Sequence, residues 1–168
     1  MHGLVYNKTF SIVNQEITDE NAAVTMSYKE NNPPKGFPFT YELQLTYTLS
    51  EKGLSIHIKA TNLDEVSFPF TVGWHPYFYT NHLQDAVVKF NSHQQVAFDE
   101  KLITKELIPF KNEGDFTIKN KQLDDCFVMN DDTIEFITPE YQLKITSDVA
   151  QNYLQMYTPP HKTLIAIE

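Results

Sequence analysis

The chain has 168 residues, of which 41% are hydrophobic, and this is enough for one domain with a sizeable buried core. Its formal net charge is −9 and its 13 basic residues are all lysines, so it lacks the clustered, arginine-rich surface that is typical of nucleic-acid binding. Without arginine, the bidentate guanidinium contact to phosphate groups is also missing.

The sequence has a single cysteine, Cys126, so no intrachain disulfide and no cysteine-based zinc site can form. It shows neither an apolar leader nor a long apolar span, and we therefore expect no membrane insertion and a reducing, cytoplasmic location. The chain starts directly at Met1-His2-Gly3 and stops at Glu168 within a strand-like pattern. We therefore expect strands to be missing at both ends.

The clearest elements are two strands in the first half of the chain. Apolar and polar residues alternate over residues 41–50 and again over residues 54–60, which is the pattern of a half-buried strand. The short link Ser50-Glu51-Lys52-Gly53 predicts that these two strands form an antiparallel hairpin.

Weaker copies of this alternation occur elsewhere, and no segment shows a helical apolar face longer than a turn or two. Prolines and Asn/Asp clusters punctuate the alternating segments, as turns do. We therefore predict an all-β fold, an antiparallel β-sandwich that forms a single domain over residues 1–168. The weaker strand patterns lie at residues 24–28, 86–90, 134–136, 141–145, 154–156 and 164–166.

The stretch from Phe68 to Phe78 combines the only tryptophan, Trp74, with His75 and several aromatic residues. A histidine has an ordinary pKa of roughly 6.5 and can donate or accept a proton near neutral pH. Aromatic faces such as those of Trp74 and Tyr77 can stack on the C–H face of a sugar ring. The alternative interpretation is an aromatic strand end whose histidine is part of the core.

Three further places combine a titratable group with apolar neighbours: His2-Gly3, the pair Asp124-Asp125 and the terminal Glu168. Each has a structural alternative, namely a disordered tag-like histidine, a turn or cap formed by the aspartates, and a solvated chain end. The remaining histidines lie in polar surroundings and are interpreted as surface residues, and no histidine spacing predicts a metal site. These surface histidines are His57, His82, His93 and His161.

Taken together, five segments resemble the ordered signature of the aldose 1-epimerase (galactose mutarotase) family, in the right order over the whole chain. The most specific of them is the His-Pro-Tyr-Phe element. The resemblance implies a large antiparallel β-sandwich, truncated in this chain, whose concave sheet holds a sugar without any cofactor or metal. The segments are residues 2–4, 73–78, 123–127, 155–159 and 165–168.

The resemblance also implies a role for each matching residue. His75 corresponds to the general acid that protonates the ring oxygen, and Glu168 to the general base that deprotonates the anomeric hydroxyl. His2 and Asp124 correspond to positions that hold ring hydroxyls. Asp125 is a second choice beside Asp124, and Trp74 and Tyr77 are the expected stacking residues.

The implied reaction interconverts the α and β anomers of a free aldose by opening and closing its ring, and positioned acid–base groups accelerate such steps by roughly 10²–10⁴-fold. Family members often carry an arginine shortly after His-Gly, where this chain has Tyr6-Asn7-Lys8. The lack of arginine favours an unphosphorylated aldohexose over a hexose phosphate.

Two other functions remain open on the sequence alone. One is a noncatalytic carbohydrate-binding sandwich, which would use the same aromatic platform and acids. The other is a truncated domain with neither activity nor sugar binding. In every case we expect self-association through exposed strand edges, because an unpaired edge invites pairing with another chain.

Overall fold

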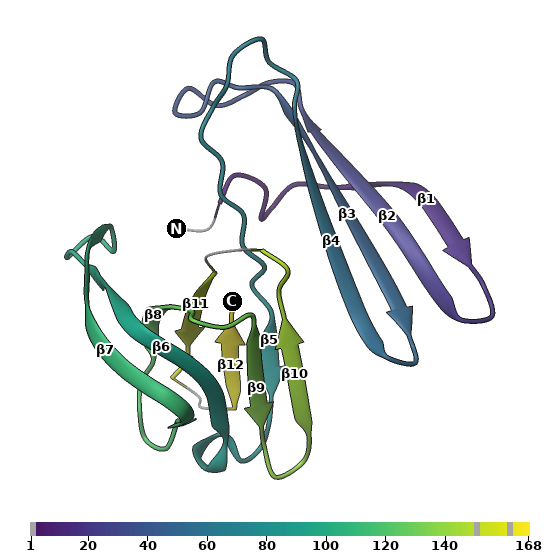
Figure 1. The fold of residues 1–168 in the computed structure, drawn as a ribbon. Coiled ribbons are helices and arrows are strands. Elements are labelled where there is room, and N and C mark those ends of the chain that lie inside the picture. Colours follow the sequence, from purple (N-terminus) through teal and green to yellow (C-terminus); the bar gives the residue numbers. More distant parts are fainter. Residues whose placement is uncertain (1–2, 150–151, 161–162) are drawn as a thin grey trace. The chain divides into compact units, whose positions relative to one another are not determined.

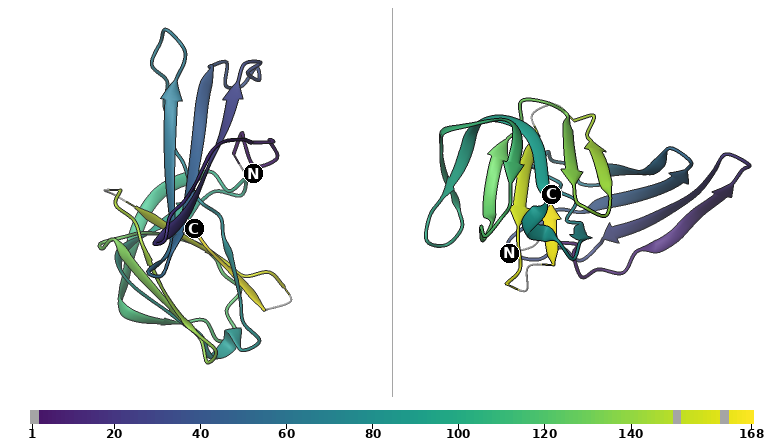
Figure 2. Two further views of the ribbon diagram at one scale, coloured as in Figure 1. Left: turned by 90° about the vertical axis from the view of Figure 1, so that its right-hand side faces the viewer. Right: turned by 90° about the horizontal axis from the view of Figure 1, so that it is seen from below.

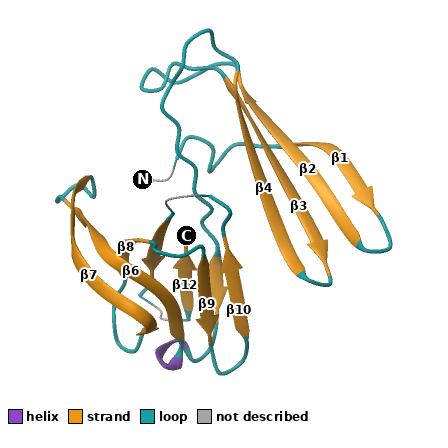
Figure 3. Ribbon diagram, in the orientation of Figure 1, coloured by secondary structure: helices purple, strands orange, loops and turns teal. Residues whose placement is uncertain are grey.

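The computed structural model describes residues 3–149, 152–160 and 163–168, and the prediction of an all-β fold is confirmed. All regular elements in these ranges are strands apart from one short 3₁₀ helix at Leu83–Asp85 (Figure 3). None of the helices in the described ranges is long and apolar enough to cross a membrane.

The chain divides into two compact units, Met1–Thr71 and Val72–Glu168, and each is described separately (Figures 1 and 2). Each unit has its own antiparallel sheet. The expectation of a single domain over residues 1–168 stays a prediction.

The first unit is a four-stranded meander in which each strand pairs with the next along the chain. The predicted hairpin is confirmed: Leu49 pairs with Leu54, and Gly53 in the turn has a φ of 128°, which glycine adopts without strain. The strands are β1 (Ser11–Ile17), β2 (Asn21–Glu30), β3 (Tyr41–Ser50) and β4 (Gly53–Asn62).

One face of this meander is apolar because the alternation is in phase across neighbouring strands. Met26, Leu45 and Ile58 lie opposite one another, and the rows on either side are also apolar. The side chains of this face are mostly only half-buried, and Leu54 is 56% exposed. Within the described part of the first unit, the meander therefore has no second layer over most of this face.

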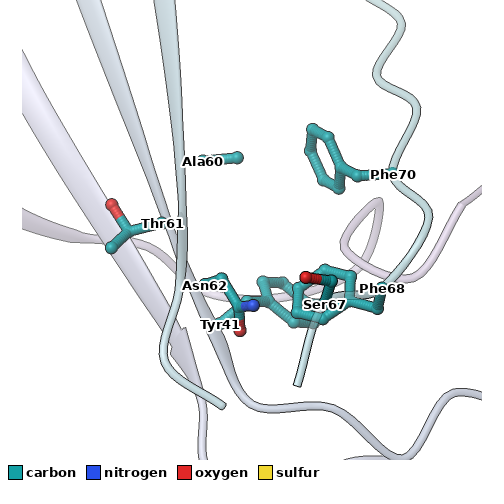
Figure 4. Close-up of a pocket in the computed structure, with 7 residues that line it drawn as sticks. All are labelled: Tyr41, Ala60, Thr61, Asn62, Ser67, Phe68 and Phe70. Carbon is teal, nitrogen blue, oxygen red and sulfur yellow. The ribbon is translucent and has the colours of Figure 1, made fainter. Parts of the chain in front are cut away.

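At one end of the meander, aromatic side chains pack around the loop that follows β4. The rings of Phe39 and Phe68 stack with centroids 4.8 Å apart, and Phe37 contacts Phe68 at 5.3 Å. A cavity of about 290 Å³ opens beside this cluster (Figure 4). It is lined by Tyr41, Ala60, Thr61, Asn62, Ser67, Phe68 and Phe70.

Glu30 is the buried charge of the first unit, with 4% of its surface exposed. Its carboxylate accepts hydrogen bonds from the Tyr28 hydroxyl at 2.6 Å and the Asn32 amide at 2.9 Å, and Lys8 Nζ lies 3.5 Å away. The bond from Tyr28 is the main reason that the pKa of Glu30 is lowered. Lys8 is thus paired with Glu30.

The described residues of the second unit form eight strands in one branched antiparallel sheet. The strands β8 and β9 pair in succession along the same edge of β6, while β7 pairs with its other edge. The strands are β5 (Tyr77–Tyr79), β6 (Val87–Phe98), β7 (Thr104–Thr117), β8 (Asp124–Val128), β9 (Thr133–Ile137), β10 (Gln142–Thr146), β11 (Tyr153–Tyr157) and β12 (Leu164–Ile167).

Because of this branching, β9–β10 and β8–β11–β12–β5 form two arms that face each other. In Figure 1, β9 and β10 lie in front of β5. The two arms are in contact, since the ring of Phe78 in β5 lies 6.0 Å from that of Phe136 in β9. The main hydrophobic cluster of the described residues fills this space, and two of its phenylalanines, Phe127 and Phe136, are almost completely buried.

Candidate functional site

His75 and Glu168 lie opposite each other at the ends of neighbouring strands of the second unit. β5 pairs with β12 through Tyr77 and Ala166, and extending this antiparallel register by two residues places His75 across from Glu168. His75 Nε2 lies 3.1 Å from Glu168 Oε1, and both side chains are partly exposed, at 29% and 21%. The structure therefore brings together the two residues predicted as acid and base.

Glu168 is held on its other side by β11. Its amide donates to the carbonyl of Gln155 at 2.9 Å, and its own carbonyl accepts from the amide of Gln155 at 3.0 Å. These two backbone bonds extend the pairing of β11 with β12 past the end of β12. The alternative of a solvated, loosely held chain end does not describe this residue.

A row of side chains continues across the sheet from this pair. His75 just before β5, Glu168 just after β12, Gln155 on β11 and Cys126 on β8 occupy successive cross-strand positions. Side chains that are directly opposite in an antiparallel pair project from the same face. These four side chains therefore project from one face of the sheet.

Asp124 belongs to the same face, two residues before Cys126 on β8. Its Oδ1 accepts a hydrogen bond from Gln155 Nε2 at 2.9 Å, so the amide side chain links Asp124 to the row that contains Glu168. Gln155 was not predicted as a site residue. The signal for it was its place in an alternating strand, where the flanking Leu154 and Met156 face the core.

Asp125 projects from the opposite face, together with Phe127 of the core. Its Oδ1 accepts a hydrogen bond from Gln95 Nε2 at 2.7 Å. The two neighbouring aspartates lie in a strand rather than in a turn, so they are separated by the sheet. The structure does not bring Asp125 together with His75 and Glu168.

Tyr77 lies on the same face as His75, and their ring centroids are 5.1 Å apart with the planes inclined by 31°. Burial raises the pKa of the Tyr77 hydroxyl, and the nearby Tyr157 and Glu168 raise it further. Tyr157 and Tyr77 flank Ala166, whose small side chain is fully buried on this face. Two tyrosines thus border the pair formed by His75 and Glu168.

Trp74 and His2 are two other predicted binding residues. Trp74 directly precedes His75, and its side chain is 39% exposed. His2 lies outside the described residues. His57, His82 and His93 are exposed, as predicted for surface residues, while His161 lies outside the described residues.

Cys126 on β8 pairs with Gln155 on β11, and Glu168 lies on the other side of Gln155. Burial is the main cause that raises the pKa of its thiol to about 11, and the charge of Glu168 contributes. The thiol therefore stays protonated near neutral pH and is not activated as a nucleophile. In the described ranges, no three His, Cys, Asp or Glu residues come together to hold a metal ion.

The face carries an imidazole and a carboxylate that contact each other. It also carries a second carboxylate, an amide and two tyrosine rings. An imidazole and a carboxylate can exchange protons with a bound molecule. A carboxylate accepts hydrogen bonds from hydroxyls, and an amide both accepts them and donates to hydroxyls. The tyrosine rings offer apolar surface. This set of groups suits a small molecule that carries several hydroxyls.

Comparison with known proteins identifies a family model and solved structures that match this chain. The model of a family described as aldose 1-epimerase matches residues 1–166, a range that includes His75 and Asp124 and ends just before Glu168. The chain is also 30% identical over 103 residues to YihR of Escherichia coli, an uncharacterized protein, and this match covers 60% of the chain and 32% of YihR.

Solved structures share the fold. A galactose mutarotase-like protein from Clostridium acetobutylicum aligns with a TM-score of 0.76 and 17% identity, covering 99% of this chain and 57% of that protein. The Slr1438 protein of Synechocystis aligns with a TM-score of 0.75 and 22% identity, covering 94% of this chain and 54% of that protein. The chain has a galactose mutarotase-like fold and spans about half the length of these structures.

Proposed function

Because the chain belongs to the aldose 1-epimerase family, we propose that it interconverts the α and β anomers of a free aldohexose by acid–base opening and closing of the ring. The observation that carries the proposal is the 3.1 Å contact between His75 Nε2 and Glu168 Oε1. The anomeric hydroxyl and the ring oxygen are bonded to the same carbon, C1. A base and an acid that serve these two oxygens can therefore lie close together.

In the proposed reaction the carboxylate of Glu168 takes the proton from the anomeric hydroxyl. The C1–O5 bond breaks with its electron pair on O5, which receives a proton from the imidazolium of His75. The open-chain aldehyde rotates about C1–C2, and the reverse proton transfers close the ring on the other face. Both residues return to their starting protonation states, so no cofactor is consumed.

The other groups of the face are proposed to hold the sugar. Asp124 accepts hydrogen bonds from ring hydroxyls, and Gln155 both accepts and donates them. Tyr77 and Trp74 provide apolar surface for the C–H face of the ring. His2 retains its proposed hydroxyl-binding role from the family signature. Asp125 has the weaker claim, since it projects from the opposite face of β8.

A neutral sugar fits the charges of this face better than a phosphorylated one. The strands β5, β8, β11 and β12 contain acids, an amide and tyrosines but neither lysine nor arginine. A phosphate group placed here would meet carboxylates without the arginine contacts that usually bind it. We therefore propose that the substrate is unphosphorylated.

Polarimetry on freshly dissolved α-glucose and α-galactose tests the proposal. The protein is expected to accelerate the change of rotation, and His75→Ala and Glu168→Gln are expected to abolish the acceleration. His93→Ala and Glu135→Gln are matched controls, because both residues lie on strands of the same unit away from this pair. Full activity in both site variants would refute the assignment, and sugar binding without acceleration would indicate a noncatalytic binding module.

We also propose that the protein self-associates through an open strand edge. In the described part of the first unit, β4 pairs only with β3, and its ten residues include no proline. Its outer backbone groups can accept a strand from a second copy. A monomer mass that does not change with concentration in sedimentation experiments would refute this.

Finally, we propose a reducing, cytoplasmic location. The single cysteine, Cys126, is partly buried and stays a thiol near neutral pH because its pKa is raised to about 11. Fractionation of cells that produce the tagged protein tests the location. Recovery of the protein outside the cytoplasmic fraction would contradict it.

A further inference from the structure

The strand that follows His75 is weakly held by its own sheet. β5 has three residues, lies at one end of the strand order and pairs only with β12 in the described ranges. One further backbone bond, from the Thr80 amide to the carbonyl of Thr163 at 3.0 Å, extends this pairing. An edge strand with so few bonds frays easily unless other contacts hold it.

Such contacts come from the turn between β9 and β10, in the opposite arm of the sheet. The Tyr141 hydroxyl donates to the carbonyl of Tyr79 at 2.6 Å. The carboxylate of Glu140 accepts from the Thr80 hydroxyl at 2.5 Å and from the Asn81 amide at 3.2 Å. We call the side chains of Glu140 and Tyr141 the β5 latch.

The latch is itself rigidly built. Thr138 Oγ1 accepts hydrogen bonds from the amides of Glu140 at 3.2 Å and Tyr141 at 2.9 Å, and donates to the carbonyl of Tyr141 at 2.9 Å. The ring of Tyr141 packs edge-on against Phe136, which in turn contacts Phe78 of β5. The turn therefore offers β5 a fixed support rather than a flexible one.

Charge strengthens one half of the latch. The hydrogen bond from Thr80 is the main cause that lowers the pKa of Glu140, so this side chain is ionised near neutral pH. Hydrogen bonds to an ionised acceptor are stronger than those between neutral groups. Thr80, the donor, is 1% exposed, so water competes little for its hydroxyl.

We propose that Glu140 and Tyr141 are positioning residues that keep His75 aligned with Glu168 by fixing the far end of β5. The inference rests on the proposed function of that pair. Tyr79 lies four residues beyond His75, or roughly 13 Å along an extended chain, so the latch is remote from the reacting atoms. It acts through β5, since a misplacement of about 1 Å in a reacting group can cost about 100-fold in rate.

The test compares Tyr141→Phe, Glu140→Gln and the double variant with the wild-type chain. Tyr141→Phe removes only the hydroxyl and keeps the ring against Phe136, so the variant is expected to fold. Asp131→Asn is the matched control, because it also changes a loop carboxylate that accepts a side-chain hydrogen bond, from Asn91 on β6. Amide hydrogen exchange and the ring resonances of His75 are recorded by NMR, alongside mutarotation kinetics.

The double variant is expected to speed amide exchange over residues 77–81 about tenfold and to shift the His75 ring resonances, while Asp131→Asn leaves both unchanged. The kcat of the double variant is expected to fall about tenfold, while its KM stays within about twofold of the wild-type value, because Asp124 and Gln155 still hold the sugar. Each single variant is expected to give a smaller change in the same direction.

Unchanged His75 resonances in the double variant would overturn the proposal, as would a rise in KM with an unchanged kcat. A wild-type chain without mutarotase activity would refute the proposed function alone. In that case the exchange rates and the His75 resonances would still decide whether the latch positions this residue.

Discussion

The two units use the same alternating strand pattern but bury it to different extents. In the second unit, twelve residues of the main cluster are buried, and Phe127 and Phe136 are almost completely enclosed. In the described part of the first unit, only Tyr41 and Leu43 are buried hydrophobic residues. The apolar face of the meander is otherwise half-buried or exposed.

The difference follows from topology. β6 pairs with β8 and β9 along one edge, so the sheet of the second unit branches into two arms that cover each other's apolar side chains. The first unit is a simple meander, and a single sheet needs a second layer to bury its apolar face. Alternation thus determines which face is apolar, while the strand order determines whether that face is covered.

The largest expected effect comes from a cavity in the branched core. Phe136→Ala should lower the free energy of unfolding of the second unit by about 3–5 kcal/mol, as is usual for a fully buried phenylalanine. Leu45→Ala, on the half-buried face of the meander, should cost clearly less. Urea denaturation measures both, and equal losses would contradict the contrast between the units.

Substitutions of the two aspartates, which lie on opposite faces of β8, should also have different effects. These effects should be somewhat smaller than that of the core cavity. Asp124→Ala should lower kcat/KM by about 10–100-fold, since a hydrogen bond to a charged group contributes roughly 1.5–3 kcal/mol. Asp125→Ala, on the core face, should mainly affect stability through its bond to Gln95. A larger loss of kcat/KM in Asp125→Ala would reverse the assignment of the two aspartates.

Self-association through the open edge of β4 should be sensitive to the apolar face of the first unit, because the side chains of an added strand would lie beside those of β4 on this face. Ile56→Lys puts a charge on this face of β4 and is expected to shift the protein toward monomer. His57→Lys puts the same charge on the opposite face of the same strand and serves as the control. Sedimentation equilibrium measures the shift, and equal behaviour of the two variants would exclude the apolar face from the contact.

Acid should affect the first unit through Glu30, and this effect is expected to be the smallest. Because the pKa of Glu30 is lower in the folded state, its contribution is fully present above the ordinary glutamate pKa of about 4.3. The contribution is lost as the pH falls through the lowered value. Glu30→Gln should therefore flatten the pH dependence of unfolding below about pH 4.3, as followed by thermal melts at several pH values.

The sequence predicted the strands whose alternation is regular and missed those in which it is broken. β3 and β4 were expected nearly residue by residue. In β1 a register shift between Ile12 and Asn14 breaks the alternation, so no period was visible. In β7 the apolar residues Leu107 and Ile108 are adjacent, and Pro109 follows them within the strand.

The site was predictable only in part. The contact of His75 with Glu168 depends on the pairing of β5 with β12, and no local pattern encodes which strands pair. Family resemblance supplied that pair. The difference between Asp124 and Asp125 could have been found from Phe127, because a core-facing phenylalanine places Asp125 on its own face. The competing interpretation as a turn hid this signal.

The adjacent acids of β8 have a consequence for how the site is kept in register. A slip of β8 by one residue, in the direction that puts Asp125 in the place of Asp124, would leave a carboxylate beside Gln155, so electrostatics alone would tolerate the error. The same slip would turn Phe127 out of the interior and into water. Hydrophobic burial of Phe127, rather than the polar groups on the opposite face, therefore fixes the register of this strand.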